Sequence, residues 1–300
     1  MSFAVIFALI AALSYGISDF LGGTAAMRLR VIPTTVLSYA AASVTLALLV
    51  LATGGAWSTP VLFWGAIAGV GAVVGFVTFY AAMAVGPMSL VSPLIAVLGS
   101  AVPVFASVVL GEVLEPLAWV GVALALVSAL LISSQPRAGG RRLSLRAAIL
   151  SVVAGVSLGS SVIALDRVPA DSGSIAGLVE IVVGLGLLGA VVALSRFVSP
   201  IRVFLRDVGG TEVVEGSRQR STAAALVAGV LLGVANAAVI AALQSGSLAV
   251  VSVLIGLYPL ATLLLARLVG GERMTRLQLT GAGLAVAASG LLGLALGGAG

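Results

Sequence analysis

The amino-acid sequence predicts an all-α membrane protein of ten transmembrane helices, arranged as two inverted five-helix repeats. Three observations predict this fold class: an extreme apolar composition, apolar segments of membrane-spanning length, and an internal repeat. Of the 300 residues, 61% are hydrophobic and only 8% are charged. A soluble domain has about 25% charged residues, so this chain cannot cover itself with polar surface in water and needs lipid as its solvent.

The apolar segments have the length of transmembrane helices. A hydrocarbon core of about 30 Å needs roughly 20 apolar residues per helix, and backbone groups in lipid must be satisfied within the segment, which favours helices. The expected helices cover residues 3–26, 33–53, 61–84, 88–110, 117–134, 147–165, 173–195, 222–243, 248–269 and 277–297. These helices and their short loops use almost the whole chain, so no room remains for a soluble catalytic or nucleic-acid-binding domain.

An internal repeat divides the chain into two halves. A shift of 160 residues without gaps aligns positions 81–130 with 241–290 and gives 16 identities across these 50 positions. The matches place Gly111-Glu112 on Gly271-Glu272, which apolar composition alone does not easily produce. We therefore expect a first five-helix repeat at residues 1–134, a basic linker at 135–146 and a second repeat at 147–300. Because five is odd, the repeats would have opposite orientations in the bilayer, which is typical of transporters.

The composition excludes several chemistries. Cys, His and Lys are absent, which removes disulfide bonds, thiol nucleophiles, His–metal sites, and catalysis by His or by a Ser–Lys pair. The net charge is +5, from fifteen Arg residues and ten acidic residues. The Arg residues lie in loops, where basic residues usually set membrane orientation, so we expect no nucleic-acid binding. The phosphate loop Gly-x-x-x-x-Gly-Lys-Ser/Thr is absent too. We expect no enzyme activity, cofactor, metal or ATP drive within this chain.

Three sequence features together resemble a known family. They are the segment SYGISDFLGG at Ser14–Gly23, the stretch from Ala81 to Pro93, and Leu110-Gly-Glu112 with Gly121, which Gly270-Gly-Glu272 and Gly281 echo. They resemble the EamA-type transporters of the drug/metabolite transporter superfamily over essentially the whole chain. The resemblance implies a ten-helix transporter of small metabolites, often an exporter. The second repeat departs from the pattern, with Gly270 for the usual Leu and Tyr258-Pro259 displaced from Pro103.

Glu180 is one of two acidic residues well inside an expected helix, where an ionisable group costs roughly 2.5–3.5 kcal/mol and usually faces a cavity or a partner. It lies about 6 Å from the middle of its helix. Antiparallel packing puts Asn236, Ser160 and Ser161 at nearly the same depth, so we expect one hydrogen-bonded layer. Glu180 then either binds the solute or a proton, or is a neutral acid that Asn236 satisfies and that only joins helices.

Asp19 is the second such residue, about 7 Å from the middle of the first helix. Tyr15 precedes it by four residues, so the two side chains share a helix face. Asp19 either takes part in binding or coupling, since an intramembrane charge is costly, or it reaches the interface and pairs with Arg28 and Arg30.

Tyr15 and Tyr258 both fall near the expected midplane, where transporters bind their cargo. Pro259 interrupts the helix after Tyr258 and frees backbone carbonyl groups that can face a cavity. The alternative is that each tyrosine hydroxyl bonds a neighbouring carbonyl group. Glu112 and Glu272 lie at turns, and we interpret them as caps of the helices that follow.

These observations favour a secondary transporter that moves a small organic solute across the cytoplasmic membrane through a cavity between the repeats. The expected partners are this solute, the lipid bilayer and protons as a candidate coupling ion, because intramembrane carboxyl groups serve in proton relays. Uniport and exchange are equally compatible with the sequence. Two alternatives come from other classes: a non-transporting membrane scaffold and an intramembrane enzyme with a carboxylate-only site. The sequence specifies neither the solute nor the oligomeric state.

The distribution of Arg also predicts an orientation. Fourteen Arg residues lie in the odd-numbered loops and only Arg167 lies in an even-numbered loop. Because basic loops stay in the cytoplasm, this bias predicts that both termini lie outside. The family resemblance implies the reverse, with both termini inside. We favour the physical argument from the loop charges.

Overall fold

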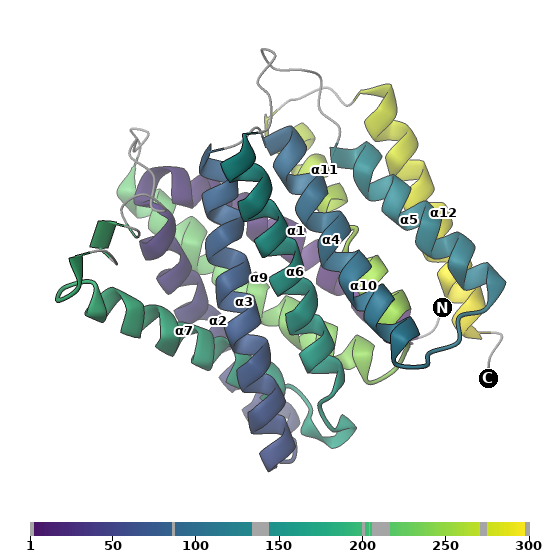
Figure 1. Ribbon diagram of the computed structural model, residues 1–300, viewed down its shortest axis with the longest axis horizontal. Coiled ribbons are helices and arrows are strands. Elements are labelled where there is room, and N and C mark those ends of the chain that lie inside the picture. Colours follow the sequence, from purple (N-terminus) through teal and green to yellow (C-terminus); the bar gives the residue numbers. More distant parts are fainter. Residues whose placement is uncertain are drawn as a thin grey trace.

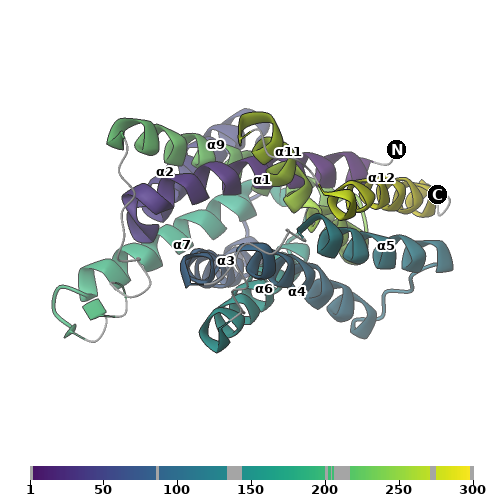
Figure 2. The same ribbon diagram turned by 90° about the horizontal axis from the view of Figure 1, so that it is seen from above.

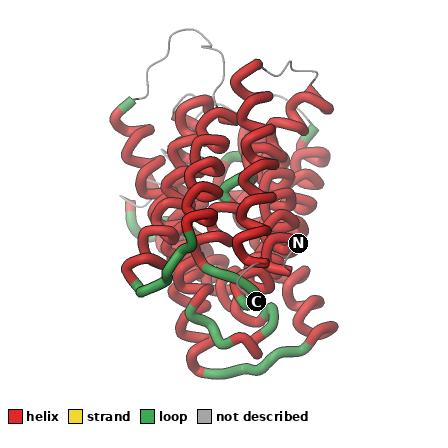
Figure 3. The backbone as a smooth tube through the Cα atoms, turned by 90° about the vertical axis from the view of Figure 1, so that its right-hand side faces the viewer, coloured by secondary structure: helices red, strands yellow, loops and turns green. Residues whose placement is uncertain are grey.

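The computed structural model describes residues 3–85, 88–133, 144–199, 202–203, 205, 217–270 and 275–297, and these residues form helices and short connections without any strand. Figure 1 labels the helices, and Figure 3 shows them running side by side with loops at their ends. The helices are α1 (Phe3–Leu29), α2 (Val31–Thr53), α3 (Thr59–Val85), α4 (Met88–Val109), α5 (Pro116–Ser133), α6 (Leu145–Asp166), α7 (Ile175–Leu194), α9 (Arg218–Leu243), α10 (Leu248–Ile255), α11 (Tyr258–Gly270) and α12 (Arg276–Gly297), with a 3₁₀ turn at Ala170–Ser172.

The apolar composition has its expected consequence, because several helices can span a bilayer. Within the described part of the chain, six helical segments are long and apolar enough, and they lie in α1, α2, α3, α6, α7 and α9. Shorter apolar helical segments occupy Leu94–Val109, Pro116–Leu131 and Leu248–Ala261. The all-helical fold class is therefore confirmed for a multi-pass membrane protein, whereas the number of ten spans stays a prediction.

The predicted helix at 248–269 is not continuous. Helix α10 ends at Ile255, a turn follows at Gly256 and Leu257, and α11 begins at Tyr258. Pro259 has no backbone N–H and cannot donate to the carbonyl group four residues earlier, so the helix breaks here. The hydroxyl of Ser100 on α4 occupies the space that a side chain at residue 256 would need, so a larger residue at the break would have to displace Ser100. The sequence placed this interruption correctly, although one helix was drawn across it.

The two halves of the chain pack mainly against each other. Helix α1 packs against α9 and α11, α3 packs against α6 and α7, and α5 packs against α12. In Figures 1 and 2, α5 and α12 lie together at one end of the molecule, and α2, α7 and α9 lie toward the other. In the internal repeat, α1, α2 and α3 correspond to α6, α7 and α9. When each helix is replaced by its counterpart, the α1–α9 pair becomes α6–α3 and the α2–α9 pair becomes α7–α3. Each of these contacts between the halves therefore has a counterpart in which the halves have exchanged places.

Glycine residues line the closest of these helix contacts. A Cβ atom at Gly69 on α3 would lie 2.5 Å from the backbone oxygen of Glu180 on α7. A Cβ atom at Gly75 would meet the Leu158 side chain on α6 at 2.6 Å. Gly155 and Gly159 face α4, and Gly229 and Gly233 face α2. Small residues four apart let helix backbones approach closely, so Gly155 with Gly159 and Gly229 with Gly233 have an ordinary role in helix packing.

Candidate functional site

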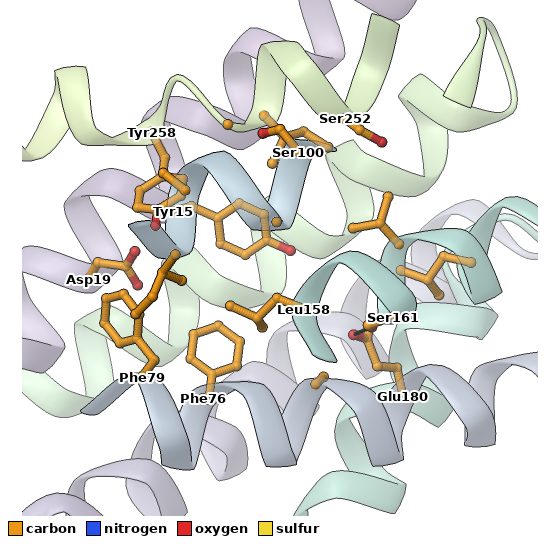
Figure 4. Close-up of a pocket in the computed structure, with 18 residues that line it drawn as sticks. Tyr15, Asp19, Phe76, Phe79, Ser100, Leu158, Ser161, Glu180, Ser252 and Tyr258 are labelled. Carbon is orange, nitrogen blue, oxygen red and sulfur yellow. Dashed lines mark hydrogen bonds between the residues drawn. The ribbon is translucent and has the colours of Figure 1, made fainter. Parts of the chain in front are cut away.

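A cavity lies between the two halves of the chain. Its lining comes from α1, α3 and α4 of the first half, and from α6, α7, α10, α11 and the α10–α11 turn of the second (Figure 4). Its volume is about 90 Å³, which is enough for a small organic group. The lining residues are Tyr15, Asp19, Ala72, Phe76, Phe79, Ile95, Ala96, Gly99, Ser100, Leu158, Ser161, Val162, Leu165, Glu180, Ser252, Ile255, Gly256 and Tyr258.

Glu180 lies at one end of this cavity and is only 4% exposed. Both of its carboxyl oxygens accept hydrogen bonds, Oε1 from the Ser161 hydroxyl at 2.9 Å and Oε2 from the Asn236 amide at 3.1 Å. The Tyr15 hydroxyl donates in turn to Oδ1 of Asn236. These four side chains come from α7, α6, α9 and α1, so one polar network joins four helices. Hydrogen bonds therefore join three of the four residues expected in one layer, namely Glu180, Asn236 and Ser161, while the function of Glu180 stays a prediction.

Ser160 does not belong to the network, which corrects one expectation. Its side chain is exposed on the outer face of α6, and its hydroxyl donates to the Val156 carbonyl group of the same helix at 2.8 Å. Successive residues on an α-helix point about 100° apart because a turn holds 3.6 residues. Only one residue of the Ser160-Ser161 pair can therefore face Glu180, and it is Ser161.

Asp19 lies at the opposite end of the cavity from Glu180 (Figure 4). Tyr258 lies close enough for an electrostatic interaction with Asp19, and so do Tyr15 and Tyr80. No hydrogen bond or ion pair to the Asp19 side chain occurs among the described residues. The alternative in which Asp19 pairs with Arg28 or Arg30 at the interface therefore does not describe this structure.

Several residues around the cavity were not predicted from the sequence. The Ser252 hydroxyl is buried in the cavity wall without a hydrogen-bond partner, and Ser252 is 3% exposed. The Tyr39 hydroxyl is also buried without a partner and interacts electrostatically with Glu180. Buried polar groups normally find a partner, so the Ser252 hydroxyl, which lines the cavity, is a candidate for binding a solute or water. Tyr39 is not a lining residue. Phe76 and Phe79 complete an aromatic wall.

Glycines also set the positions of two tyrosines beside the site. A Cβ atom at Gly22 would lie 2.6 Å from the Tyr80 hydroxyl, and one at Gly184 would lie 2.6 Å from the Tyr39 ring. Gly22 is three residues after Asp19 and shares its helix face. Gly22 indicates space beside Asp19, but the sequence does not identify Tyr80 as the side chain that fills this space.

Glu112 lies beside a different helix from the one expected. Its carboxyl group interacts with the Ser107 side chain and with the backbone of Ala249, in the first turn of α10. One carboxyl oxygen, Oε1, is buried without a hydrogen-bond partner. Burial raises the pKa of Glu112 above its usual value of 4.5, and the negative charge of Asp166 acts in the same direction. The Gly-Glu turn of the first repeat therefore contacts the second repeat. Its counterpart Glu272 lies outside the described residues.

The apolar helices and the cavity between two half-chains define a multi-pass integral membrane protein with two helical repeats. The model of the EamA-like transporter family matches residues 2–134 and 145–294, one match in each half. The chain belongs to the EamA-like transporter family, within the drug/metabolite transporter superfamily. A crystal structure of a protein with 19% sequence identity covers 96% of this chain and 95% of its own, with a TM-score of 0.70, which shows a shared fold. A comparison with curated proteins returned no match.

Proposed function

We propose that this protein is a secondary transporter that exports a small organic metabolite across the cytoplasmic membrane. The observation that carries the proposal is the cavity with two carboxylic acids, lined by both halves of the chain. A scaffold protein has no need for an enclosed polar site, and an ionisable group in a transmembrane bundle usually marks a solute or ion pathway.

The helix contacts support a mechanism of alternating access. Because the contacts of α1 and α2 with α9 recur as those of α6 and α7 with α3, the two halves are related by an approximate exchange. We propose ten helices in two repeats, at residues 1–134 and 147–300, that lie inverted in the membrane and join through the linker at 135–146. Inverted repeats give two conformations of similar energy, one open to each side.

The proposed site consists of two parts with different states of hydrogen bonding. Glu180, Asn236, Ser161 and Tyr15 form a closed network, whereas Asp19 and Tyr258 face the cavity from its other end. Proton coupling would use one of the two carboxyl groups. Glu180 is the stronger candidate for this role, because protonation of either carboxyl oxygen changes its bonds to two other helices.

The test is a metabolite-efflux screen of cells with and without the gene, followed by flux of the identified solute in proteoliposomes. We expect a solute whose efflux requires the protein and whose flux falls in a variant with a blocked cavity, Gly99→Phe. The exposed substitution Val44→Phe on α2 is the matched control. Normal flux in the cavity variant would refute the proposed pathway, and chemical conversion of the solute in vesicles would favour an enzyme.

A further inference from the structure

We propose that the transported solute is a small organic cation, with an ammonium group that binds between Asp19 and the aromatic side chains beside it. This inference rests on the proposed transport function and names the class of its solute. It follows from three properties of the cavity: the charge of its lining, the hydrogen bonding of its two carboxyl groups, and the chemistry of its apolar wall.

The charge of the lining selects against anions. Among the described residues that line the cavity, two are acidic and none is basic. A carboxylate or phosphate solute would therefore meet charges of its own sign in a medium of low dielectric constant, where repulsion is strong. A cation would instead supply the positive charge that the wall lacks.

The two carboxyl groups differ in the number of hydrogen bonds that they already accept. Glu180 already accepts two hydrogen bonds, from Ser161 and Asn236. Asp19 accepts none from the described residues, although it lies inside a bundle where an unpaired carboxylate is costly. A bound cation would therefore supply the partner that Asp19 lacks. Glu180 is not needed as a direct partner of the cation.

The wall around Asp19 suits an ammonium group with an apolar body. Figure 4 shows Phe79 and Tyr258 at the same end of the cavity as Asp19, and Tyr15 and Phe76 continue the aromatic wall toward Glu180. Aromatic faces attract organic cations, and quaternary ammonium groups are recognised by aromatic cages. The remaining lining is mostly aliphatic, so the rest of the solute is expected to be apolar.

One polar group of the wall is left for a second contact. The Ser252 hydroxyl lines the cavity, is buried and has no hydrogen-bond partner. This orphan hydroxyl belongs to α10, whereas Asp19 belongs to α1, so a solute that reaches both would bridge the two repeats. The geometry therefore favours a cation that also carries a hydroxyl or carbonyl group.

Choline is a suitable probe because it has a neutral analogue of the same shape. In this analogue, an alcohol, a carbon atom replaces the quaternary nitrogen and removes the charge. The purified full-length protein in detergent is titrated with choline, with this neutral alcohol and with the anion tert-butylacetate, and the thermal midpoint of unfolding is followed. We expect choline alone to raise the midpoint in a saturable manner. Asp19→Asn is expected to weaken choline binding roughly tenfold to a hundredfold, and Asp171→Asn, in an exposed loop, is expected to leave it unchanged.

The outcomes separate this inference from the proposed function. Equal stabilisation by the neutral alcohol, preference for the anion, no choline binding, or full binding by Asp19→Asn would each overturn the cation site. The comparison of choline with its neutral analogue uses the wild-type protein and stands even if a variant fails to fold. Choline binding without flux of any solute would refute transport and keep the site, whereas flux of an anionic solute would keep transport and refute the cation.

Discussion

The contact between Gly69 and the backbone of Glu180 allows a sharp test of how α3 positions the site. A Cβ atom at residue 69 would lie 2.5 Å from the Glu180 carbonyl oxygen and 3.0 Å from Val183 Cβ, whereas ordinary contacts begin at 3.4 Å. Gly69→Ala therefore requires a separation of α3 and α7 by roughly 0.9 Å at this point, because a backbone oxygen within a helix cannot turn aside.

The expected cost follows from two opposing effects. Overpacking a close helix contact costs about 1–3 kcal/mol, while Ala is favoured over Gly in a helix by roughly 0.8–1 kcal/mol. Gly186→Ala on α7 is the matched control, because a Cβ atom there meets nothing within 4 Å. We expect Gly69→Ala to lower the free energy of unfolding by up to about 2 kcal/mol and Gly186→Ala to raise it by up to about 1 kcal/mol.

The assay is unfolding by sodium dodecyl sulfate in mixed micelles, followed by circular dichroism, with solute flux measured on the same preparations. A shift of α7 by this distance would stretch the Glu180 hydrogen bonds to Ser161 and Asn236, which are 2.9 and 3.1 Å long. We therefore expect reduced flux in Gly69→Ala and normal flux in Gly186→Ala. Equal stabilities of the two alanine variants would show that α3 and α7 are not in the close contact described above.

Three further predictions concern coupling, stability and orientation. Glu180→Gln keeps the size of the side chain but cannot take up a proton, so we expect flux in proteoliposomes to lose its pH dependence; an unchanged pH profile would leave Glu180 with a structural role only. Because burial raises the pKa of Glu112 above 4.5, the folded protein holds this proton more tightly than the unfolded chain, and the associated stability is complete below about pH 4.5 and lost as the pH rises through the raised pKa. The thermal midpoint of the wild type should thus fall more steeply above pH 4.5 than that of Glu112→Gln, and parallel curves would contradict the burial of this group. Because the natural chain has no Cys, single substitutions Glu115→Cys and Arg146→Cys can be labelled in intact cells with an impermeant maleimide; the Arg distribution predicts labelling at 115 and protection at 146, and the reverse pattern would favour the orientation implied by the family resemblance.

The depth of a residue along its helix could be predicted from the sequence, but the direction of its side chain could not. Helix boundaries and the 1.5 Å rise per residue brought Glu180, Asn236 and Ser161 to one level, and the structure joins them by hydrogen bonds. Ser160 was included because it has the same depth. Its exclusion depends on the rotation of α6 about its own axis, which is set by contacts with α3 and α4.

Contacts between the repeats were the least predictable part of the site. Ser252 carries no local signal, because it becomes part of the site only through the packing of α10 against α1 and α4 of the first half. Glu112 was assigned to α5 by proximity along the chain, whereas its carboxyl group interacts with the backbone of Ala249 in the N-terminal turn of α10. A helix N-terminus attracts a carboxylate whichever helix it belongs to, so proximity along the chain does not identify the helix beside which the carboxylate lies.

The position of Tyr15 links the two ends of the cavity. Tyr15 lies four residues before Asp19 on the same face of α1, and its hydroxyl donates to Asn236, which in turn donates to Glu180. Among the four members of the network, only Tyr15 belongs to the first half of the chain, so a movement of α1 against the second half must break the Tyr15–Asn236 bond first. A cation that draws Asp19 toward itself would exert such a force on α1. Tyr15→Phe should therefore leave solute binding at Asp19 largely intact while weakening its effect on the protonation of Glu180, and a proton-to-solute ratio equal to that of the wild type in Tyr15→Phe would refute this link.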